Sequence, residues 1–256
     1  METGSIVVPG RFCGPPDTGN GGYTAGLLAA RTGLAGNGGL GGLGGLTGDG
    51  AAVRVTLRQP PPLESAMVVT VEDGATTARF GGAVVATAEP GRLEAALVEP
   101  VPWQTAHAAQ AAYRGLVGHP FPGCFVCGPD RPPGGPEGGL GLQPGPVGDP
   151  GPGGDGWVAT TWVPDSSLAG PDGRIPPELV WAALDCPGGW TSDLGDRPMV
   201  LGRITVAVDA LPEPGDRCVV VGQRLGVDGR KAFTASTAYD SDGRVLGHAE
   251  STWIAI

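Results

Sequence analysis

The sequence predicts an α+β fold in which two consecutive halves each form an antiparallel sheet wrapped around one central helix. Three observations predict it. The halves share one order of segments, Asp-Gly and Gly-Gly pairs divide both halves at matching places, and several segments alternate between two kinds of side chain. Such pairs between alternating segments indicate hairpins, and alternation indicates strands with one packed face. One helix per half can cover that face.

Each half is expected to begin with a Cys-Gly pair and then a helix. The pairs are Cys13-Gly14 and Cys127-Gly128, and the helices are predicted over residues 20–32 and 176–186. Pro176-Pro177-Glu178 suits the start of the second helix, because proline is tolerated in the first turn and an acid complements the positive end of the helix dipole.

Four strand-like segments follow each helix. Proline breaks come after the first segment, Asp73-Gly74 and Asp228-Gly229 separate the second from the third, and Gly81-Gly82 and Asp242-Gly243 separate the third from the fourth. The segments of the first half are 53–63, 65–74, 75–80 and 83–90, and those of the second are 202–216, 217–229, 230–240 and 244–251.

The halves are expected to be two domains, residues 1–105 and 118–256, joined by an alanine-rich linker helix over 106–117. The chain has 48 Gly and 27 Pro, which cluster in 33–50 and 128–156. An excess of these residues is typical of low-complexity segments, so we interpret both clusters as flexible insertions. The two sheets are expected to join edge to edge, which removes exposed strand edges.

In this arrangement the chain resembles the tandem hotdog acyl-CoA thioesterases over most of its length. GNGGYTAGLLA (19–29) is similar to the start of that family's first hotdog helix, and PELVWAALDCPGGW (177–190) is similar to its second, where an acid follows a small apolar run. The resemblance implies a double hotdog fold, hydrolysis of an acyl-CoA thioester, a small-molecule coenzyme A ester as partner, and no cofactor.

Asp185 is the first candidate site residue. It lies in the predicted last turn of helix 176–186, just before Pro187-Gly188-Gly189, where the helix dipole disfavours a carboxylate. A residue placed against local preference is a candidate for function. The resemblance implies that this acid is catalytic and activates water or attacks the thioester carbonyl, and a carboxylate can do either. The structural alternative is that Asp185 only accepts hydrogen bonds from the turn that follows.

Asn20-Gly21-Gly22 is the second candidate, as a substrate-binding segment at the start of the first helix. Free backbone N–H groups there can bind a carbonyl or phosphate oxygen, and glycine lets a ligand approach closely. The resemblance implies that the segment polarises the thioester carbonyl. Plain N-capping by Asn20 is the alternative. Because the first helix has no acid, at most one active site per chain is expected, with Asp185 paired to the donor segment of the other half.

A third motif, HPFPGCFVCG (119–128), has two possible interpretations. His119, Cys124 and Cys127 have a spacing that suits three zinc ligands, and the fourth would have to come from Cys13 or Cys186. Alternatively, residues 124–127 form an apolar strand at the start of the second half. A redox role is not favoured, since a Gly/Pro run follows instead of a helix. No metal is assigned from the sequence.

The net charge of the chain and its first residues argue against nucleic-acid binding, membrane insertion and secretion. The net charge of −10 excludes the overall basic footprint that nucleic-acid binding needs. No apolar stretch approaches the roughly 18 residues of a membrane span, and residues 1–11 do not resemble a signal peptide. We therefore expect a cytoplasmic protein with reduced thiols. Arginine greatly outnumbers lysine, which suggests a bacterial genome, and self-association is left open.

Two functions remain in competition. The first is thioester hydrolysis, and the second is a non-catalytic hotdog protein that binds acyl thioesters or serves as a scaffold. A complete site needs a polar partner near Asp185, and the candidates on the predicted strands are Thr205, Thr234, Ser236 and Glu250. A hotdog hydratase is not favoured, because no histidine lies near Asp185 in the sequence.

Overall fold

The computed structural model describes residues 2–33, 51–148 and 156–256. The predicted insertion at 33–50 therefore lies outside the described residues except for Gly33, and so does the 149–155 part of the second insertion. No helix within the described ranges is long and apolar enough to cross a membrane.

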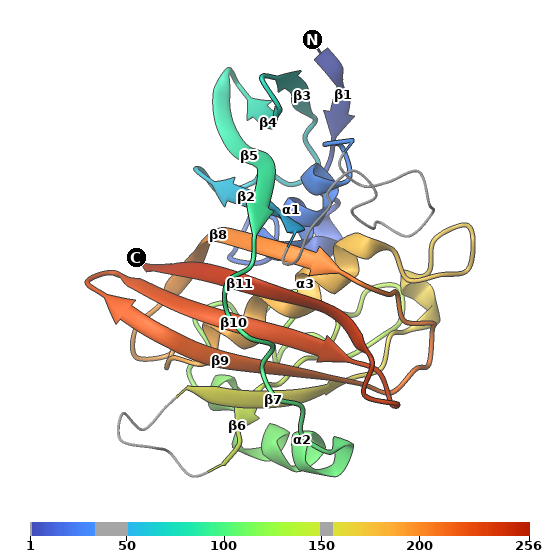
Figure 1. Cartoon of the computed structure of the whole chain (residues 1–256), viewed down its shortest axis with the longest axis vertical. Coiled ribbons are helices and arrows are strands. Elements are labelled where there is room, and N and C mark those ends of the chain that lie inside the picture. Colours follow the sequence, from blue (N-terminus) through green and yellow to red (C-terminus); the bar gives the residue numbers. More distant parts are fainter. Residues whose placement is uncertain (1, 34–50, 149–155) are drawn as a thin grey trace.

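The described strands form one antiparallel sheet of 11 strands in the order β1-β3-β4-β5-β2-β8-β11-β10-β9-β7-β6 (Figure 1). The strands are β1 (Glu2–Ile6), β2 (Ala51–Leu57), β3 (Met67–Glu72), β4 (Ala75–Phe80), β5 (Ala83–Arg92), β6 (Gly145–Pro146), β7 (Trp157–Trp162), β8 (Met199–Val208), β9 (Cys218–Asp228), β10 (Lys231–Tyr239) and β11 (Val245–Ala255). The helices are α1 (Gly21–Ala29), α2 (Trp103–Ala109) and α3 (Pro177–Gly189).

The two halves repeat one strand order about the centre of the sheet. On one side the order outward from the centre is β2, β5, β4, β3, β1, and on the other it is β8, β11, β10, β9, β7. Strands β2 and β8 pair with each other, with Val53 opposite Val206 and Val55 opposite Ile204. The halves are thus joined edge to edge, and they form one continuous sheet rather than two separate ones.

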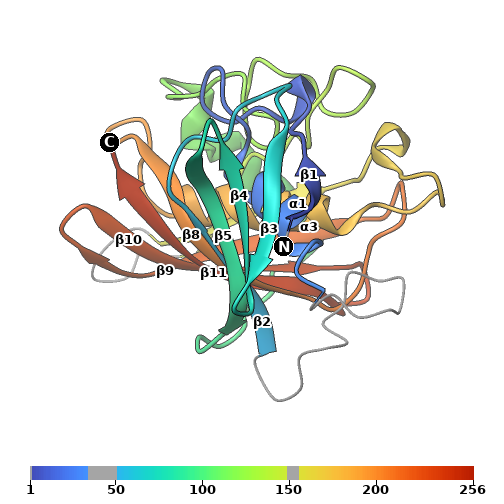
Figure 2. The ribbon, with the colours of Figure 1, turned by 90° about the horizontal axis from the view of Figure 1, so that it is seen from above.

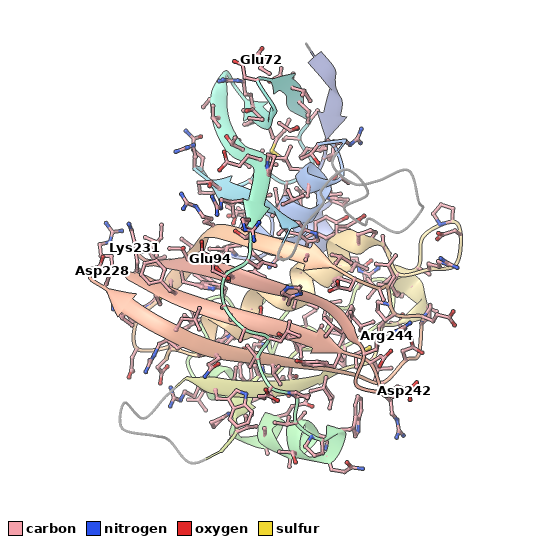
Figure 3. All side chains as sticks on the ribbon, viewed as in Figure 1. Glu72, Glu94, Asp228, Lys231, Asp242 and Arg244 are labelled. Atoms are coloured by element: carbon pink, nitrogen blue, oxygen red, sulfur yellow. The ribbon has the colours of Figure 1, made fainter. Side chains whose placement is uncertain are left out.

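The predicted turns connect the predicted strands. Asp73 and Gly74 between β3 and β4 have φ of 50° and 77°, and Gly81 and Gly82 between β4 and β5 have φ of 57° and 83°. Positive φ at both central residues is what a tight hairpin with right-handed strand twist requires. In the second half, Figure 3 shows the turn beside Asp228 and Lys231 at one end of the sheet and the turn beside Asp242 and Arg244 at the other.

Helices α1 and α3 lie next to each other on the same side of the sheet (Figures 1 and 2). Two glycines of α1 make the contact close. A Cβ on Gly22 would lie 2.7 Å from the backbone oxygen of Trp181, and a Cβ on Gly26 would lie 2.6 Å from the Cα of Glu178. Both distances are too short for any larger residue, so the helix backbones touch where these glycines are. This contact brings the start of α1 to the last part of α3.

Two elements differ from the sequence-based expectation. Helix α3 continues through Pro187 to Gly189, so Asp185 lies one turn before the end. The linker is not one helix over 106–117, because α2 ends at Ala109 and two short 3₁₀ turns follow, Gln110–Ala112 and Arg114–Leu116. Alanine alone does not extend the helix through Tyr113, whose ψ of 117° is extended.

Residues 128–148 are not the flexible insertion that their Gly and Pro content predicted. Leu140 and Leu142 are buried, and their N–H groups donate to the carbonyls of Phe125 and Val126 at 2.8 and 2.9 Å. The segment is therefore held in place by two buried apolar side chains and by backbone hydrogen bonds, although its composition is typical of disorder.

Candidate active site

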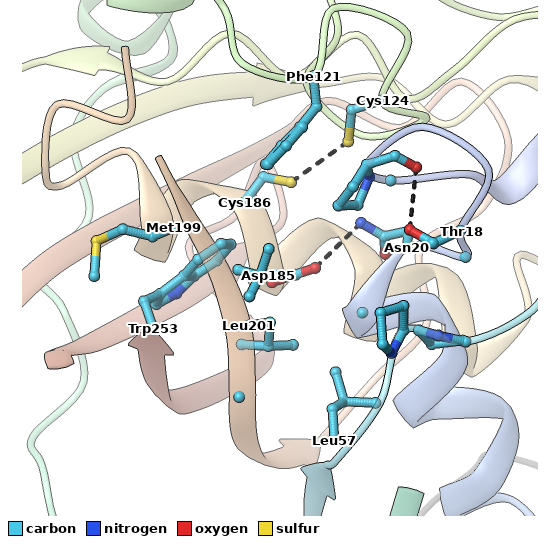
Figure 4. A pocket seen from close by; sticks show the side chains of 18 of the residues that line it. Thr18, Asn20, Leu57, Phe121, Cys124, Asp185, Cys186, Met199, Leu201 and Trp253 are labelled. Carbon is cyan, nitrogen blue, oxygen red and sulfur yellow. Dashed lines mark hydrogen bonds between the residues drawn. The ribbon is translucent and has the colours of Figure 1, made fainter. Parts of the chain in front are cut away.

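Asp185 is held by the helix that belongs to the other half of the chain. Its side chain is 2% exposed. One carboxylate oxygen, Oδ2, accepts a hydrogen bond from the Asn20 amide at 3.1 Å and another from the Gly22 N–H at 2.9 Å (Figure 4). The predicted acid and the predicted donor segment therefore meet, although 165 residues separate Asn20 from Asp185.

Asn20 has two roles at once. Its Oδ1 accepts from the N–H of Tyr23 at 2.8 Å, which is the capping interaction that satisfies a free donor of the first helical turn. Its Nδ2 donates to Asp185. The capping interpretation and the site interpretation of Asn20 are therefore compatible, since they use different atoms of one amide.

The second oxygen of Asp185 has no partner in the part of the chain that the structure describes. Oδ1 is buried and makes no hydrogen bond there. Burial raises the pKa of Asp185 to about 7, and the nearby Cys124 adds to the rise, whereas the hydrogen bonds from Gly22 and Asn20 oppose it. A buried carboxyl with a raised pKa and an unsatisfied oxygen is typical of functional sites.

Asp185 lies on the wall of a cavity of about 410 Å³, a size within the usual range for small-molecule sites. The wall is mostly apolar, and Figure 4 shows Leu57, Leu201, Met199, Trp253 and Phe121 around the carboxylate. Asn20 and Gly21 line the same cavity. Both halves of the chain therefore contribute to one pocket.

The start of α1 offers fewer free donors than the sequence suggested. The Gly22 N–H is taken by Asp185 and the Tyr23 N–H by Asn20. The Gly21 N–H has no acceptor among the described residues, and a Cβ on Gly21 would lie 2.9 Å from Leu201. Gly21 is thus the residue of the Asn20-Gly21-Gly22 segment that lines the cavity and whose backbone N–H has no acceptor among the described residues.

The strand residues considered as polar partners do not line the cavity. Ser236 Oγ donates to the Leu184 carbonyl at 2.5 Å, Thr205 accepts from Arg54, and Glu250 accepts from the N–H groups of Glu94 and Ala95. Thr234 Oγ1 is buried without a partner in the described chain. The polar contact to Asp185 comes from Asn20 instead.

Sequence reasoning missed the segment that follows β2. Residues 58–61 line the cavity, and Arg58 and Gln59 are exposed there. The proline run after the first strand is the signal in the sequence for this segment, but by itself it indicates only where the strand ends. Arg58 is therefore an exposed positively charged residue in the lining of the cavity.

A cluster of three cysteines forms the adjoining part of the cavity wall. The sulfurs of Cys124, Cys127 and Cys186 all lie within 4.8 Å of one another. Cys124 and Cys186 are in contact at 3.9 Å (Figure 4). Hydrogen bonds from the Cys127 and Cys186 thiols lower the pKa of Cys124, and backbone N–H groups of Cys127 and Val126 contribute in the same direction. Residues 124–127 form a turn, not the apolar strand that was one interpretation.

His119 extends this cluster. Its Nε2 lies 3.4 Å from Cys127 Sγ, and its ring packs edge-on against Trp190, with centroids 4.9 Å apart. Trp190 in turn donates from Nε1 to Cys127 Sγ at 3.4 Å. Of the two fourth members that the sequence suggested, the structure brings Cys186 to the cluster, whereas the Cys13 thiol contacts the Gly123 carbonyl and Arg131.

No protein-family model matches the chain, and no curated protein sequence matches it. Solved structures that are similar over nearly the whole length include the following two. The tesB protein of Mycobacterium avium subsp. paratuberculosis matches with a TM-score of 0.57 and 13% identity, over 94% of this chain and 89% of that one. A conserved protein of unknown function with hot dog fold from Alicyclobacillus acidocaldarius matches with a TM-score of 0.54 and 13% identity, over 98% and 91%. This chain therefore has the hotdog fold.

Proposed function

We propose that the protein hydrolyses an acyl-CoA thioester in the cavity beside Asp185. The observation that carries the proposal is the burial and hydrogen bonding of this carboxylate. It is buried and fixed by two donors through Oδ2, while Oδ1 is unpartnered among the described residues at a mostly apolar cavity wall. A purely structural acid would be expected to satisfy both oxygens.

In this proposal each residue of the site has a role. Asp185 acts on the thioester, either as a general base for water or as a nucleophile. Asn20 and Gly22 orient it. The Gly21 N–H polarises the thioester carbonyl and stabilises the charge that develops on its oxygen. The similarity to the tesB protein over nearly the full length supports a function of this class, as does the sequence resemblance to the tandem hotdog thioesterases.

The direct test is release of free thiol from short, medium, long and aromatic acyl-CoAs by the purified protein, with a blank for the protein's own cysteines. Turnover of at least one class supports the proposal. If no class is hydrolysed, thioester hydrolysis is excluded for these substrates.

One observation favours the second candidate, binding without turnover. Asp185 accepts from the Gly22 N–H and from the Asn20 amide, and Asn20 accepts from the Tyr23 N–H, which leaves the Gly21 N–H alone for the substrate oxygen. Titration of a non-hydrolysable acyl-CoA thioether distinguishes the candidates, because Trp253 lines the cavity and its fluorescence reports occupancy. Saturable binding without thiol release would establish this alternative.

Replacing Asn20 with Ser separates the two roles of the amide. Serine is a good N-cap, so the thermal midpoint is expected to change little. The donor to Asp185 is lost, and a hydrogen bond to a charged group contributes about 1.5–3 kcal/mol. We therefore expect kcat to fall about 10- to 100-fold, as measured by thiol release. A lower thermal midpoint with unchanged kcat would show that Asn20 is only a cap.

Replacing Arg58 with Ala is expected to raise KM for acyl-CoA and leave kcat unchanged. Arg58 is the arginine that lines the described cavity, and an exposed guanidinium there can pair with a phosphate of coenzyme A. The matched substrate is an acyl-N-acetylcysteamine, which lacks the phosphates. Its KM should be the same for both proteins, and an equal rise for both substrates would contradict a phosphate contact.

A further inference from the structure

We propose that Cys124, Cys127, Cys186 and His119 bind one Zn²⁺ as a structural site in the wall of the cavity. This inference does not depend on the proposed thioesterase activity. Three thiolates and one imidazole are a common ligand set for closed, tetrahedral zinc sites.

The distances between the ligand atoms fit such a site. With Zn–S of about 2.3 Å and Zn–N of about 2.0 Å, tetrahedral angles place two sulfurs about 3.8 Å apart and a sulfur and a nitrogen about 3.5 Å apart. In the structure Cys124 Sγ and Cys186 Sγ are 3.9 Å apart, and Cys127 Sγ and His119 Nε2 are 3.4 Å apart. The remaining distances between the three sulfurs are at most 4.8 Å, so the sulfurs need to approach one another by at most about 1 Å. Of the three sulfurs, His119 is in contact only with that of Cys127, so its ring has to move toward the other two sulfurs when the ion binds.

The backbone conformation keeps Cys124 and Cys127, the two cysteines that are close in sequence, on one tight turn. Residues 124–128 form a tight turn in which the Gly128 N–H donates to the Cys124 carbonyl at 2.9 Å. A Cβ on Gly128 would lie 2.3 Å from the Pro122 oxygen and 2.5 Å from the Cys124 nitrogen. Only glycine fits at position 128, so the glycine after Cys127 permits the turn that keeps the Cys124 and Cys127 sulfurs close to each other. Trp190 then donates to Cys127 Sγ, an outer contact of the kind that supports metal ligands.

His119 has to change one hydrogen bond to become the fourth ligand. Its Nδ1 accepts from the Phe121 N–H at 2.8 Å, which places the ring proton on Nε2, facing Cys127. Ligation through Nε2 requires that proton to be on Nδ1, so the bond from Phe121 must be given up when zinc binds. His119 is therefore expected to contribute less to the affinity than each cysteine.

The site would join two distant parts of the chain. Cys124 and Cys127 belong to the segment that begins the second half, and Cys186 is the residue after Asp185 on α3. With four protein ligands the ion has no open position, so it would not act on the substrate. It would fix the end of α3 that carries Asp185.

The first measurement is the metal content of the full chain, purified without a metal-affinity step, by inductively coupled plasma mass spectrometry. We expect about one zinc per chain, and X-ray absorption should fit three sulfurs near 2.3 Å and one nitrogen near 2.0 Å. Because these data come from the unmodified protein, they are decisive even if a cysteine variant fails to fold. Metal-free protein that also fails to take up added Zn²⁺, a shell of oxygen and nitrogen only, or a disulfide between two of these cysteines would overturn the proposal.

Variants then assign the ligands. Cys127→Ala and Cys186→Ala are expected to lose the metal, whereas the controls Cys218→Ala, buried in β9 away from the cluster, and Cys13→Ala should keep it. His119→Ala should weaken Zn²⁺ binding by at least the roughly 10- to 100-fold that an outer-shell contact costs, in competition with a chromophoric chelator. Unchanged affinity in His119→Ala would remove His119 from the ligand set, and equal metal loss in Cys218→Ala would overturn the site.

Discussion

Replacing Asp185 with Asn is expected to reduce thiol release from acyl-CoA by roughly 100- to 10,000-fold, the range for loss of a general base. Asparagine has the same shape, and its side-chain oxygen can still accept from Asn20 and Gly22. It cannot take a proton from water or attack a carbonyl as a carboxylate does. The measurement is kcat/KM on the best acyl-CoA, with the thermal midpoint recorded alongside.

The matched control is Glu178→Gln, which also replaces an acid on α3 with its neutral amide. Burial raises the pKa of Glu178 as well, yet this residue is not among those that line the cavity. Its activity should remain near that of the unmodified protein. An equal loss in both variants would point to a general effect of charge on α3, and full activity in Asp185→Asn would exclude the proposed mechanism.

Replacing Gly22 with Ala is expected to have the largest effect on stability. The added Cβ would lie 2.6 Å from the Cβ of Asp185 and 2.7 Å from the backbone oxygen of Trp181, and neither atom can move without shifting α3. Overpacking of this kind costs about 1–3 kcal/mol, which lowers the thermal midpoint by about 2–4 °C for each kcal/mol in a chain of this size. Activity should fall too, because the shift moves the Gly22 N–H away from Asp185.

Gly226→Ala provides the comparison for thermal unfolding. No heavy atom lies within 4 Å of a Cβ built on Gly226, and its φ is not positive, so the thermal midpoint should stay the same or rise slightly. If Gly22→Ala unfolds at the same temperature as the unmodified protein, the close packing of α1 on α3 is not what holds the site together.

Local patterns in the sequence predicted helices α1 and α3 and strands β2 to β5 and β8 to β11, but not strands β1, β6 and β7. The hairpins at Asp73-Gly74 and Gly81-Gly82 follow from residues that accept positive φ, and the strand order repeats because the two halves repeat. The sequence patterns gave wrong predictions where contacts between residues far apart in the sequence determine the local structure. Pro187 does not end α3, and residues 128–148 are fixed because Leu140 and Leu142 reach the core.

The sequence by itself therefore determined the repeat, the central helix and four strands of each half, and the candidate residues Asp185, Asn20, Gly21 and Gly22, since these depend on local patterns and on the resemblance that the patterns carry. The pairing of Asp185 with the other half was predicted, but only the tertiary structure decided which atoms meet. The glycines of α1 let two helix backbones touch, and this contact carries Asn20 and Gly22 to one oxygen of Asp185. The same packing brings Cys186 to Cys124 and Cys127. Such meetings depend on how helices pack in space, and spacing in the sequence does not encode that geometry.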